Sequence, residues 1–255
     1  MAAVTLLSTR GVSRHFGGLH AVEDVDFDLQ AGEIHALIGP NGAGKTTFVS
    51  LLSGRLPVTA GTIAFGGRDI TSLPAHRRVP LGIAYTFQIT SIYANLSLFD
   101  NVALPAQRRL QVEGLAPRRH LRERTMRALA RVGLEDRADQ QAGALSYGHQ
   151  RLLEIAMGLA LEPRLLILDE PTQGLAESEI AAFKSLVRAV AESATVLLIE
   201  HNMDVVMDLA ERITVLNFGR KLAEGTPDEI QANRAVQAAY LGSPETPDNA
   251  GGSAV

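Results

Sequence analysis

The residue types best suited to chemistry stand in the run GPNGAGKTT, residues 39–47. This run has the spacing G-x-x-x-x-G-K-[ST], follows an apolar segment and precedes a helix-forming one. Glycines at this spacing let successive backbone N–H groups point inward as an anion nest, and the N-terminus of the next helix adds partial positive charge. The run predicts a cradle for the phosphates of a nucleoside triphosphate, contacted by Gly39, Asn41, Gly42, Ala43, Gly44, Lys45, Thr46 and Thr47.

Two side chains of this cradle have distinct expected roles. Lys45 would reach the β- and γ-phosphates, and the Thr46 hydroxyl would take one position on Mg²⁺. Lys45 is one of three lysines in a chain with 21 arginines, so this position holds the compact ammonium against the general preference for guanidinium. The alternative is a glycine-rich turn that merely links a strand to a helix.

A metal beside the phosphates needs a carboxylate, and the run LLILDE, residues 165–170, ends an apolar strand with two of them. Ligands of open α/β sheets bind at the carboxyl ends of the strands. Asp169 is expected to orient Mg²⁺ through water, and Glu170 to act as the base that polarises the attacking water. The alternative is an ordinary acidic pair before Pro171, which the upstream cradle disfavours.

These residues require a sheet whose strand ends meet along one edge. Short apolar runs predict strands, and the later ones are separated by segments of helical length, as in a parallel sheet covered by helices. Residues 104–143 are rich in Arg, show no strand signal and predict helices. The expected strands are 25–29, 33–39, 62–65, 82–86, 165–169, 195–199 and 213–217.

Composition narrows the class of protein. With 46% hydrophobic residues, the 255-residue chain can bury one substantial core, or one core with a small subdomain. The net charge of −4 gives no reason to expect a nucleic-acid partner, and the absence of Cys excludes disulfides and thiolate chemistry. No basic leader and no apolar run of about 18 residues is present, so any membrane role is expected to come through a partner. The polar tail 243–255 is expected to be disordered.

The order of motifs resembles that of the ATP-binding subunit of an ABC transporter. TFQ ends at Gln88, similar to the family's lone glutamine that touches metal and water, and LSYGHQ, residues 145–150, resembles the LSGGQ-type signature. The resemblance implies that Ser146, the Gly148 backbone and the dipole of the following helix bind the γ-phosphate of an ATP held by a second ATPase domain. Ser146 is also well placed as a helix N-cap.

Two further segments match in the expected order. LLIEHN places His201 after an apolar run, similar to the family's switch histidine that contacts the γ-phosphate and supports Glu170. RHFGGLHAV resembles the adenine-stacking segment, which implies that Phe16 stacks on the base and Val22 packs by the ribose. Taken singly, His201 fits a surface or packing residue, and Phe16 fits a core residue followed by a turn.

Three positions depart from the family pattern. Tyr147 replaces the signature's first Gly, and His149 adds a residue before Gln150, which is expected to change the shape of the turn. Ala176 stands where the family usually has an Asp that communicates across the dimer. Coupling between two ATP sites is therefore expected to be weaker or to use backbone contacts.

The resemblance implies the fold class α/β: a P-loop NTPase core with a mostly parallel sheet, an antiparallel β subdomain and an inserted α-helical subdomain. Residues 1–242 would form one ABC ATPase domain. Residues 1–92 and 162–242 would supply the core with its β subdomain, and residues 93–161 the helical subdomain.

At finer grain, FGGLHAV, LSYGHQRLLEIA and FGRKLAEGTP resemble the subgroup that serves uptake of branched-chain amino acids. This implies an ATP-hydrolysing importer subunit that uses ATP and Mg²⁺ at the cytoplasmic face of the inner membrane. Its implied partners are a second ABC ATPase, two membrane permeases docked around residues 92–102 and, indirectly, a periplasmic binding protein. The alternatives are the ATPase of a lipopolysaccharide-type exporter and a soluble ABC ATPase outside transport.

Overall fold

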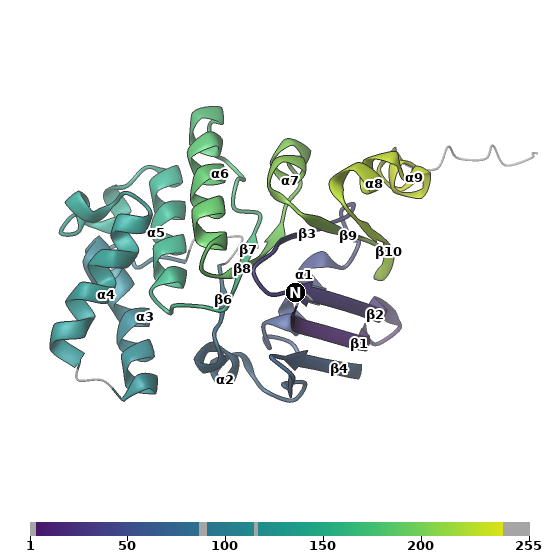
Figure 1. The fold of residues 1–255 in the computed structure, drawn as a ribbon, viewed down its shortest axis with the longest axis horizontal. Coiled ribbons are helices and arrows are strands. Elements are labelled where there is room, and N and C mark those ends of the chain that lie inside the picture. Colours follow the sequence, from purple (N-terminus) through teal and green to yellow (C-terminus); the bar gives the residue numbers. More distant parts are fainter. Residues whose placement is uncertain (1–3, 87–90, 115–116, 242–255) are drawn as a thin grey trace, which may run out of the picture.

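The computed structural model describes residues 4–86, 91–114 and 117–241, which form two sheets and a set of helices (Figure 1). The strands are β1 (Thr5–Phe16), β2 (Leu19–Gln30), β3 (Ile34–Ile38), β4 (Ala60–Phe65), β5 (Arg68–Asp69), β6 (Ile83–Tyr85), β7 (Leu165–Asp169), β8 (Thr195–Ile199), β9 (Arg212–Asn217) and β10 (Arg220–Gly225). The helices are α1 (Lys45–Leu52), α2 (Ala75–Arg78), α3 (Leu98–Glu113), α4 (Pro117–Arg131), α5 (Tyr147–Leu159), α6 (Glu177–Ala191), α7 (Met203–Leu209), α8 (Pro227–Ala232) and α9 (Arg234–Leu241).

The larger sheet has the strand order β10-β9-β3-β8-β7-β6, and every neighbouring pair in it except β10 with β9 is parallel. The smaller sheet, β2-β1-β4-β5, is antiparallel. In Figure 1 it lies at the opposite end of the molecule from α3, α4 and α5. The predicted fold class is confirmed.

The central strands are continuous apolar runs because both of their faces are covered. Along β7, Leu166 and Leu168 pack into the core beneath α5 and α6, whereas Leu165 and Ile167 pack into the core shared with α1 and the smaller sheet. Side chains alternate across a strand, so neighbouring residues serve opposite cores. Burying each of these side chains stabilises the fold by roughly 1.5–3 kcal/mol.

Three strands are absent from the sequence-based prediction: β1, β5 and β10. The pairing of β1 with β2 shifts register between Thr9 and Val12, around Gly11, so the apolar residues of β1 do not alternate regularly. β10 begins after a tight hairpin in which Phe218 and Gly219 have φ of 46° and 75°. Two successive positive φ values are typical of a type I′ turn. The usual sequence at these two positions is Asn-Gly, which Phe218 and Gly219 match only at the glycine.

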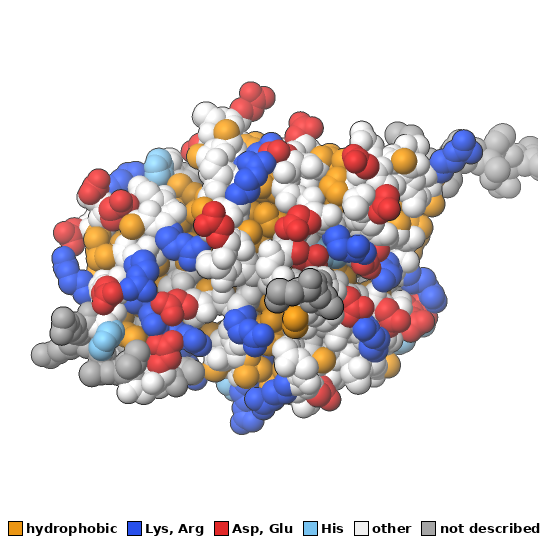
Figure 2. Space-filling model, viewed as in Figure 1, with side chains coloured by type: hydrophobic (Ala, Val, Ile, Leu, Met, Phe, Trp, Pro, Cys, Tyr) orange, Lys and Arg blue, Asp and Glu red, His pale blue; other side chains and the backbone are white. Residues whose placement is uncertain are grey.

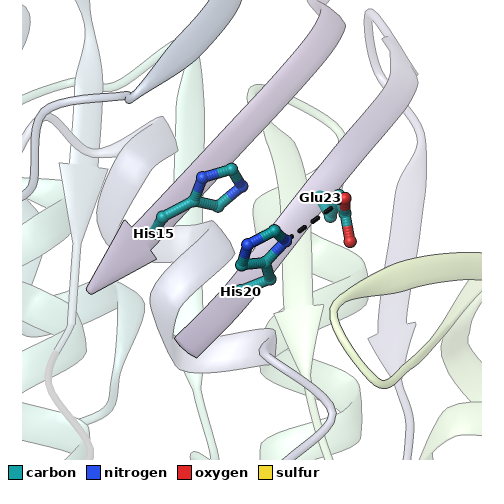
Figure 3. A group of neighbouring side chains, drawn as sticks. All are labelled: His15, His20 and Glu23. Carbon is teal, nitrogen blue, oxygen red and sulfur yellow. Dashed lines mark ion pairs between the residues drawn. The ribbon is translucent and has the colours of Figure 1, made fainter. Parts of the chain in front are cut away.

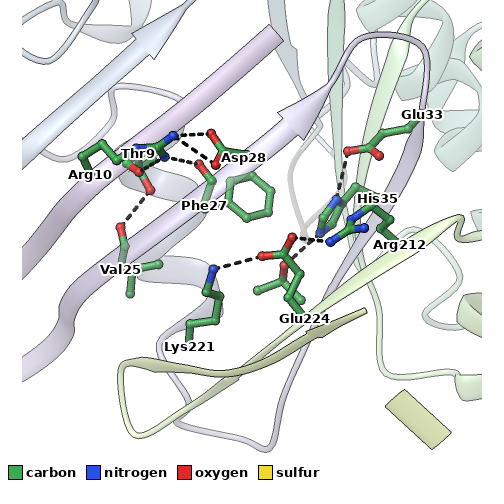
Figure 4. A network of polar contacts seen from close by, with 11 residues as sticks. Thr9, Arg10, Val25, Phe27, Asp28, Glu33, His35, Arg212, Lys221 and Glu224 are labelled. Carbon is green, nitrogen blue, oxygen red and sulfur yellow. Dashed lines mark hydrogen bonds and ion pairs between the residues drawn. The ribbon is translucent and has the colours of Figure 1, made fainter. Parts of the chain in front are cut away.

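A polar network joins β3, β9 and β10 of the larger sheet (Figure 4). The buried His35 ring lies 3.1 Å from the Glu33 carboxylate through Nδ1 and 2.9 Å from the Thr214 hydroxyl through Nε2. On β10, Glu224 accepts from Arg212 at 2.8 Å and from Lys221 at 3.0 Å. Because buried polar groups are costly when unpaired, these bonds specify the register of β3, β9 and β10.

The arginine-rich segment forms a solvated helical face with many ion pairs. Arg124 pairs with Glu113 and Glu162, and Arg127 pairs with Glu123. On the face drawn in Figure 2, basic and acidic side chains are interspersed over this helical end. None of the helices in the described ranges combines the length and apolar character that a membrane span requires.

Arg78 supports the far end of α1, the helix that begins at the glycine cradle. Its buried guanidinium donates to the carbonyls of Leu51 and Leu52, both at 2.8 Å, and to Leu73 O at 2.7 Å. Burial lowers the pKa of Arg78 to about 10, so the side chain stays charged at neutral pH. The last carbonyls of a helix have no partner within it, and Arg78 supplies one.

Arg78→Met is therefore expected to lower the free energy of unfolding by about 3 kcal/mol, because the buried carbonyls of Leu51 and Leu52 and the partly buried carbonyl of Leu73 lose a charged donor. Urea unfolding followed by circular dichroism measures the effect. Arg77→Met is the matched control, since Arg77 is exposed and adjacent. Equal midpoints for the two variants would contradict the capping role.

Candidate nucleotide site

The glycine cradle lies directly against two strands, one from each sheet. Gly39 and Gly44 have φ of 150° and 95°, in the region that L side chains rarely adopt. A Cβ on Gly44 would lie 2.3 Å from Ala21 O of β2, and one on Gly39 would lie 2.1 Å from Leu216 O of β9. These two glycines are required by backbone contact as well as by φ, so the loop is held close to the sheet.

The chain offers a matched pair of glycines to test this fit. Gly44→Ala is expected to destabilise the protein by more than about 3 kcal/mol, because it adds a clash with backbone to the strain of positive φ. Gly42→Ala has the strain alone, since φ is 79° and no atom lies within 4 Å of the added Cβ, and should cost about 1–2 kcal/mol. Thermal unfolding of both variants compares the costs, and a similar loss in each would refute the close contact.

Lys45 is buried within the cradle and points along it. Its ammonium donates to Gly39 O at 2.7 Å and Pro40 O at 3.1 Å. Burial lowers the pKa of Lys45, and the carboxylates of Glu170 and Asp169 partly oppose that shift. A cation held this way is placed to exchange loop carbonyls for the oxygens of a phosphate.

A cavity of about 430 Å³ opens at the cradle. Residues 41–47 line one side of it, and Glu170, His201, His20 and Phe218 are among the residues that complete the wall. The cavity thus brings together the predicted cradle, the predicted base and the predicted switch histidine from segments far apart in sequence.

Asp169 ends β7 with its side chain almost fully buried. Its Oδ2 accepts a hydrogen bond from the Tyr85 hydroxyl, whereas Oδ1 is buried without a hydrogen-bond partner in the described part of the chain. Burial raises the pKa of Asp169, and the bond from Tyr85 partly opposes the rise. A buried carboxylate oxygen without a donor, at the same carboxyl edge of the sheet as the loop between β3 and α1, fits the oxygen ligands and bridging water that Mg²⁺ prefers.

Glu170 and His201 form a pair at the mouth of the cavity. The Glu170 carboxylate Oε1 lies 2.9 Å from His201 Nε2, and Glu170 adopts a φ of 47°. Arg151 Nη2 donates to Glu170 O at 3.1 Å, and Glu200 accepts from the His201 backbone N–H at 2.9 Å. The strained φ of Glu170 is held by these neighbours, as is typical of residues at functional sites.

The signature turn does not reach this cavity. Ser146 is the N-cap of α5, with its Oγ 2.7 Å from His149 Nδ1. Gly148 packs against Glu179 of α6: an added Cβ would lie 2.2 Å from its carboxylate, which in turn accepts from Ala176 N at 2.9 Å. The expected insertion at His149 makes no bulge, because α5 runs without interruption from Tyr147 and absorbs His149 into its first turn.

Neither Phe16 nor Val22, the residues predicted to contact the base and the ribose, lines the cavity. Phe16 ends β1 half-exposed, with the Arg14 guanidinium 4.5 Å from its ring centroid, and it is not among the residues that line the cavity. Val22 is fully buried in the core, whereas the preceding residue, Ala21, lines the cavity. Gln88 and the tail 243–255 lie outside the described residues.

Tyr85 and Glu200 are functional candidates that the sequence pattern did not reveal. Tyr85 reaches Asp169 only because β6 pairs with β7, a contact between residues far apart in sequence. Glu200 stands beside His201 in LLIEHN, and its buried carboxylate accepts from Thr172 and from the backbone before α7. An acidic residue directly after an apolar run was the available signal for Glu200.

A glycine cradle on a parallel sheet, with a buried carboxylate and a Glu–His pair at the strand ends, defines a P-loop nucleotide-binding protein. A family model described as "ABC transporter" matches residues 22–173, and one described as "Branched-chain amino acid ATP-binding cassette transporter" matches residues 220–246. The chain belongs to the ABC transporter ATP-binding family, so it is a nucleotide-binding ATPase of a transporter complex.

Known relatives align with this chain over nearly its whole length. The high-affinity branched-chain amino acid transport ATP-binding protein LivG of Salmonella typhimurium is 40% identical, with 93% of this chain and 98% of the relative covered. BraF of Pseudomonas aeruginosa is 39% identical at the same coverage. The lipopolysaccharide export system ATP-binding protein LptB of Escherichia coli is 33% identical, covering 92% and 97%. A nucleotide-free ABC transporter cassette superposes with a TM-score of 0.85 at 25% identity, covering 94% of this chain and 100% of the other.

Proposed function

We propose that this ABC ATPase powers the import of branched-chain or related amino acids. The single observation that carries the hydrolytic part is the 2.9 Å contact of Glu170 with His201 at the mouth of the cavity that Lys45 enters. The import part is supported by the names of LivG and BraF, which are more similar to this chain than LptB is. An export ATPase is the second candidate because LptB also aligns over 92% of the chain.

In the proposed mechanism, the cradle N–H groups and Lys45 bind the phosphates of ATP. Mg²⁺, when bound, neutralises charge on the β- and γ-phosphates, and Thr46, Asp169 and Gln88 are the residues that would hold it, Asp169 through water. Glu170 accepts a proton from the attacking water. In this proposal His201 fixes the Glu170 carboxylate through Nε2 and also contacts the γ-phosphate.

The base and ribose contacts are proposed for the hairpin of β1 and β2. Phe16 offers one ring face to adenine, since Arg14 covers the other. The ribose contact falls to Ala21, which lines the cavity, in place of Val22, whose side chain is buried.

The assembly we propose has two ATPase chains, each site taking its cradle from one chain and Ser146 and Gly148 from the other. This is supported by the position of the signature turn away from its own cavity and by its exposed N-terminus at Ser146. Residues 93–161 form the helical subdomain in this proposal, and residues 92–102 face the two permeases at the cytoplasmic side of the membrane. A cassette of Clostridium perfringens that matches with a TM-score of 0.80 at 27% identity is described as part of an ABC transporter complex.

Ser146→Arg tests the shared site. The expected result is loss of ATP hydrolysis with unchanged ATP affinity of the monomer, because Ser146 acts on the nucleotide of the partner. Ser185→Arg, on the exposed face of α6, is the control. Hydrolysis rates and equilibrium binding are measured on each purified variant; normal turnover in Ser146→Arg would remove the trans role.

The transport assignment is tested by affinity capture of the chain from detergent-solubilised membranes of its own host, followed by mass spectrometry. Recovery of two different permeases and a second ATPase supports amino-acid import. Recovery of this ATPase alone with lipid-export permeases establishes the second candidate instead. Recovery of no membrane protein refutes a transport role.

A further inference from the structure

A group of metal-ligating side chains lies on the β1–β2 hairpin, beside the nucleotide cavity. His15 and His20 are direct partners across the two strands, and their rings stack with centroids 3.9 Å apart and planes 12° apart. Glu23 lies next to them, with Oε1 3.3 Å from His20 Nδ1 (Figure 3). We name these three residues the hairpin cluster.

A β-bulge builds the hairpin cluster. Arg14 pairs with Val22 and His15 pairs with His20, so β2 contains one residue more than β1 at this point, Ala21. In a regular strand, residues three apart face opposite sides of the sheet. The extra residue reverses that alternation and brings Glu23 to the side of His20; such bulges commonly re-aim side chains next to functional sites.

The ligand atoms of the hairpin cluster lie close enough together to bind one cation. One ligand atom from each of the three residues lies within 4.8 Å of the other two. His15 Nε2 is buried and has no hydrogen-bond partner in the described part of the chain. Arg220 holds the second oxygen of the Glu23 carboxylate at 2.9 Å. A basic side chain that orients a liganding carboxylate is a usual outer partner of a metal site.

We propose that His15, His20 and Glu23 bind a divalent transition ion of the Zn²⁺ class, with water in the remaining position. Two imidazoles and one carboxylate are a typical ligand set for Zn²⁺ or Co²⁺, whereas Mg²⁺ prefers oxygen ligands alone. Binding at about 2.0–2.1 Å draws the ligand atoms to within roughly 3.4 Å of one another. The half-exposed His20 side chain can turn to allow this, and the ring stacking is then lost.

The same bulge connects the hairpin cluster to the phosphate cradle. The carbonyl of Ala21 is the atom that a Cβ on Gly44 would meet at 2.3 Å, and Glu23 N donates to Gly219 O at 2.8 Å on the cavity wall. An ion that fixes His20 and Glu23 therefore fixes one wall of the cavity. This coupling rests on the proposed nucleotide binding. It raises the affinity for ATP severalfold, because a preorganised cavity wall loses less conformational freedom when ATP binds.

The metal site is tested first without nucleotide or Mg²⁺, so that its outcome does not depend on the proposed function. Co²⁺ is titrated into the full chain and followed by visible absorption, which no Cys thiolate can obscure. We expect one ion in this site per chain, displaced by Zn²⁺, and at least a tenfold loss of affinity in His15→Asn and in His20→Asn. His76→Asn, on the exposed surface of α2, is the matched control.

Equal Co²⁺ binding in the wild type and both cluster variants would overturn the site. Glu23→Gln guards against a folding artefact, because it keeps the side-chain shape and is expected to weaken binding by about tenfold. ATP affinity is then measured with and without Zn²⁺ in wild type and His20→Asn. A gain in the wild type alone supports the coupling; ion binding without any gain overturns the coupling, and failure of ATP to bind at all overturns the proposed function instead.

Discussion

Glu170→Gln is expected to bind ATP as tightly as the wild type and to hydrolyse it about 10²–10⁴-fold more slowly, the usual contribution of a general base. The amide keeps the size of the carboxylate and its contact with His201, so the cavity stays intact. It cannot accept the proton of the attacking water. Single-turnover hydrolysis and equilibrium ATP binding, measured on the same preparation, separate the two properties.

Glu192→Gln is the control for this substitution, because Glu192 is exposed at the end of α6 and lies apart from the cavity. It should retain wild-type turnover. Near-normal hydrolysis in Glu170→Gln would show that another group takes the proton and that the contact with His201 serves only to position a loop.

Lys45→Met is expected to weaken ATP affinity by about 10–100-fold, which corresponds to the loss of a charged hydrogen bond of about 1.5–3 kcal/mol. In the free protein the Lys45 ammonium is already removed from water and bonds two carbonyls of its own loop. Methionine fills a similar volume without a buried charge. The unfolding temperature measured without ATP should therefore stay close to that of the wild type, although the affinity for ATP falls.

Lys184→Met provides the comparison, since Lys184 of α6 pairs with Asp208 of α7 and does not line the cavity. Isothermal titration calorimetry with ATP, alongside thermal unfolding, distinguishes binding from folding. If Lys184→Met lowered the affinity as much as Lys45→Met, the effect would be one of total charge and the cradle assignment of Lys45 would fail.

The parts of the site that the sequence predicts are those defined by short spacing. The cradle, the acidic pair and the segment around His201 are each contained within a few residues that follow an apolar run. Their convergence on one cavity follows from the parallel arrangement of β3, β7 and β8, whose carboxyl ends share an edge. Periodicity was sufficient to predict that arrangement.

The parts that the sequence does not predict depend on pairing between distant strands. Tyr85 reaches Asp169 through the register of β6 with β7. The burial of Val22 and the position of Ala21 on the cavity wall follow from how the β1–β2 hairpin faces the cradle. Apolar alternation predicts which residues share a face, but it cannot tell which neighbour that face will meet.

The position of β3 within the larger sheet has a consequence for how the protein is made. β3 carries the cradle near the start of the chain, yet both of its neighbours, β8 and β9, are translated near the end. On the ribosome the cradle strand therefore emerges with both edges unpaired, and exposed edges favour aggregation. Nascent chains that stop before β8 should need a chaperone and should not be retained on an ATP matrix. ATP binding should appear in a single late step, when the full chain is released and β8 and β9 can pair with β3.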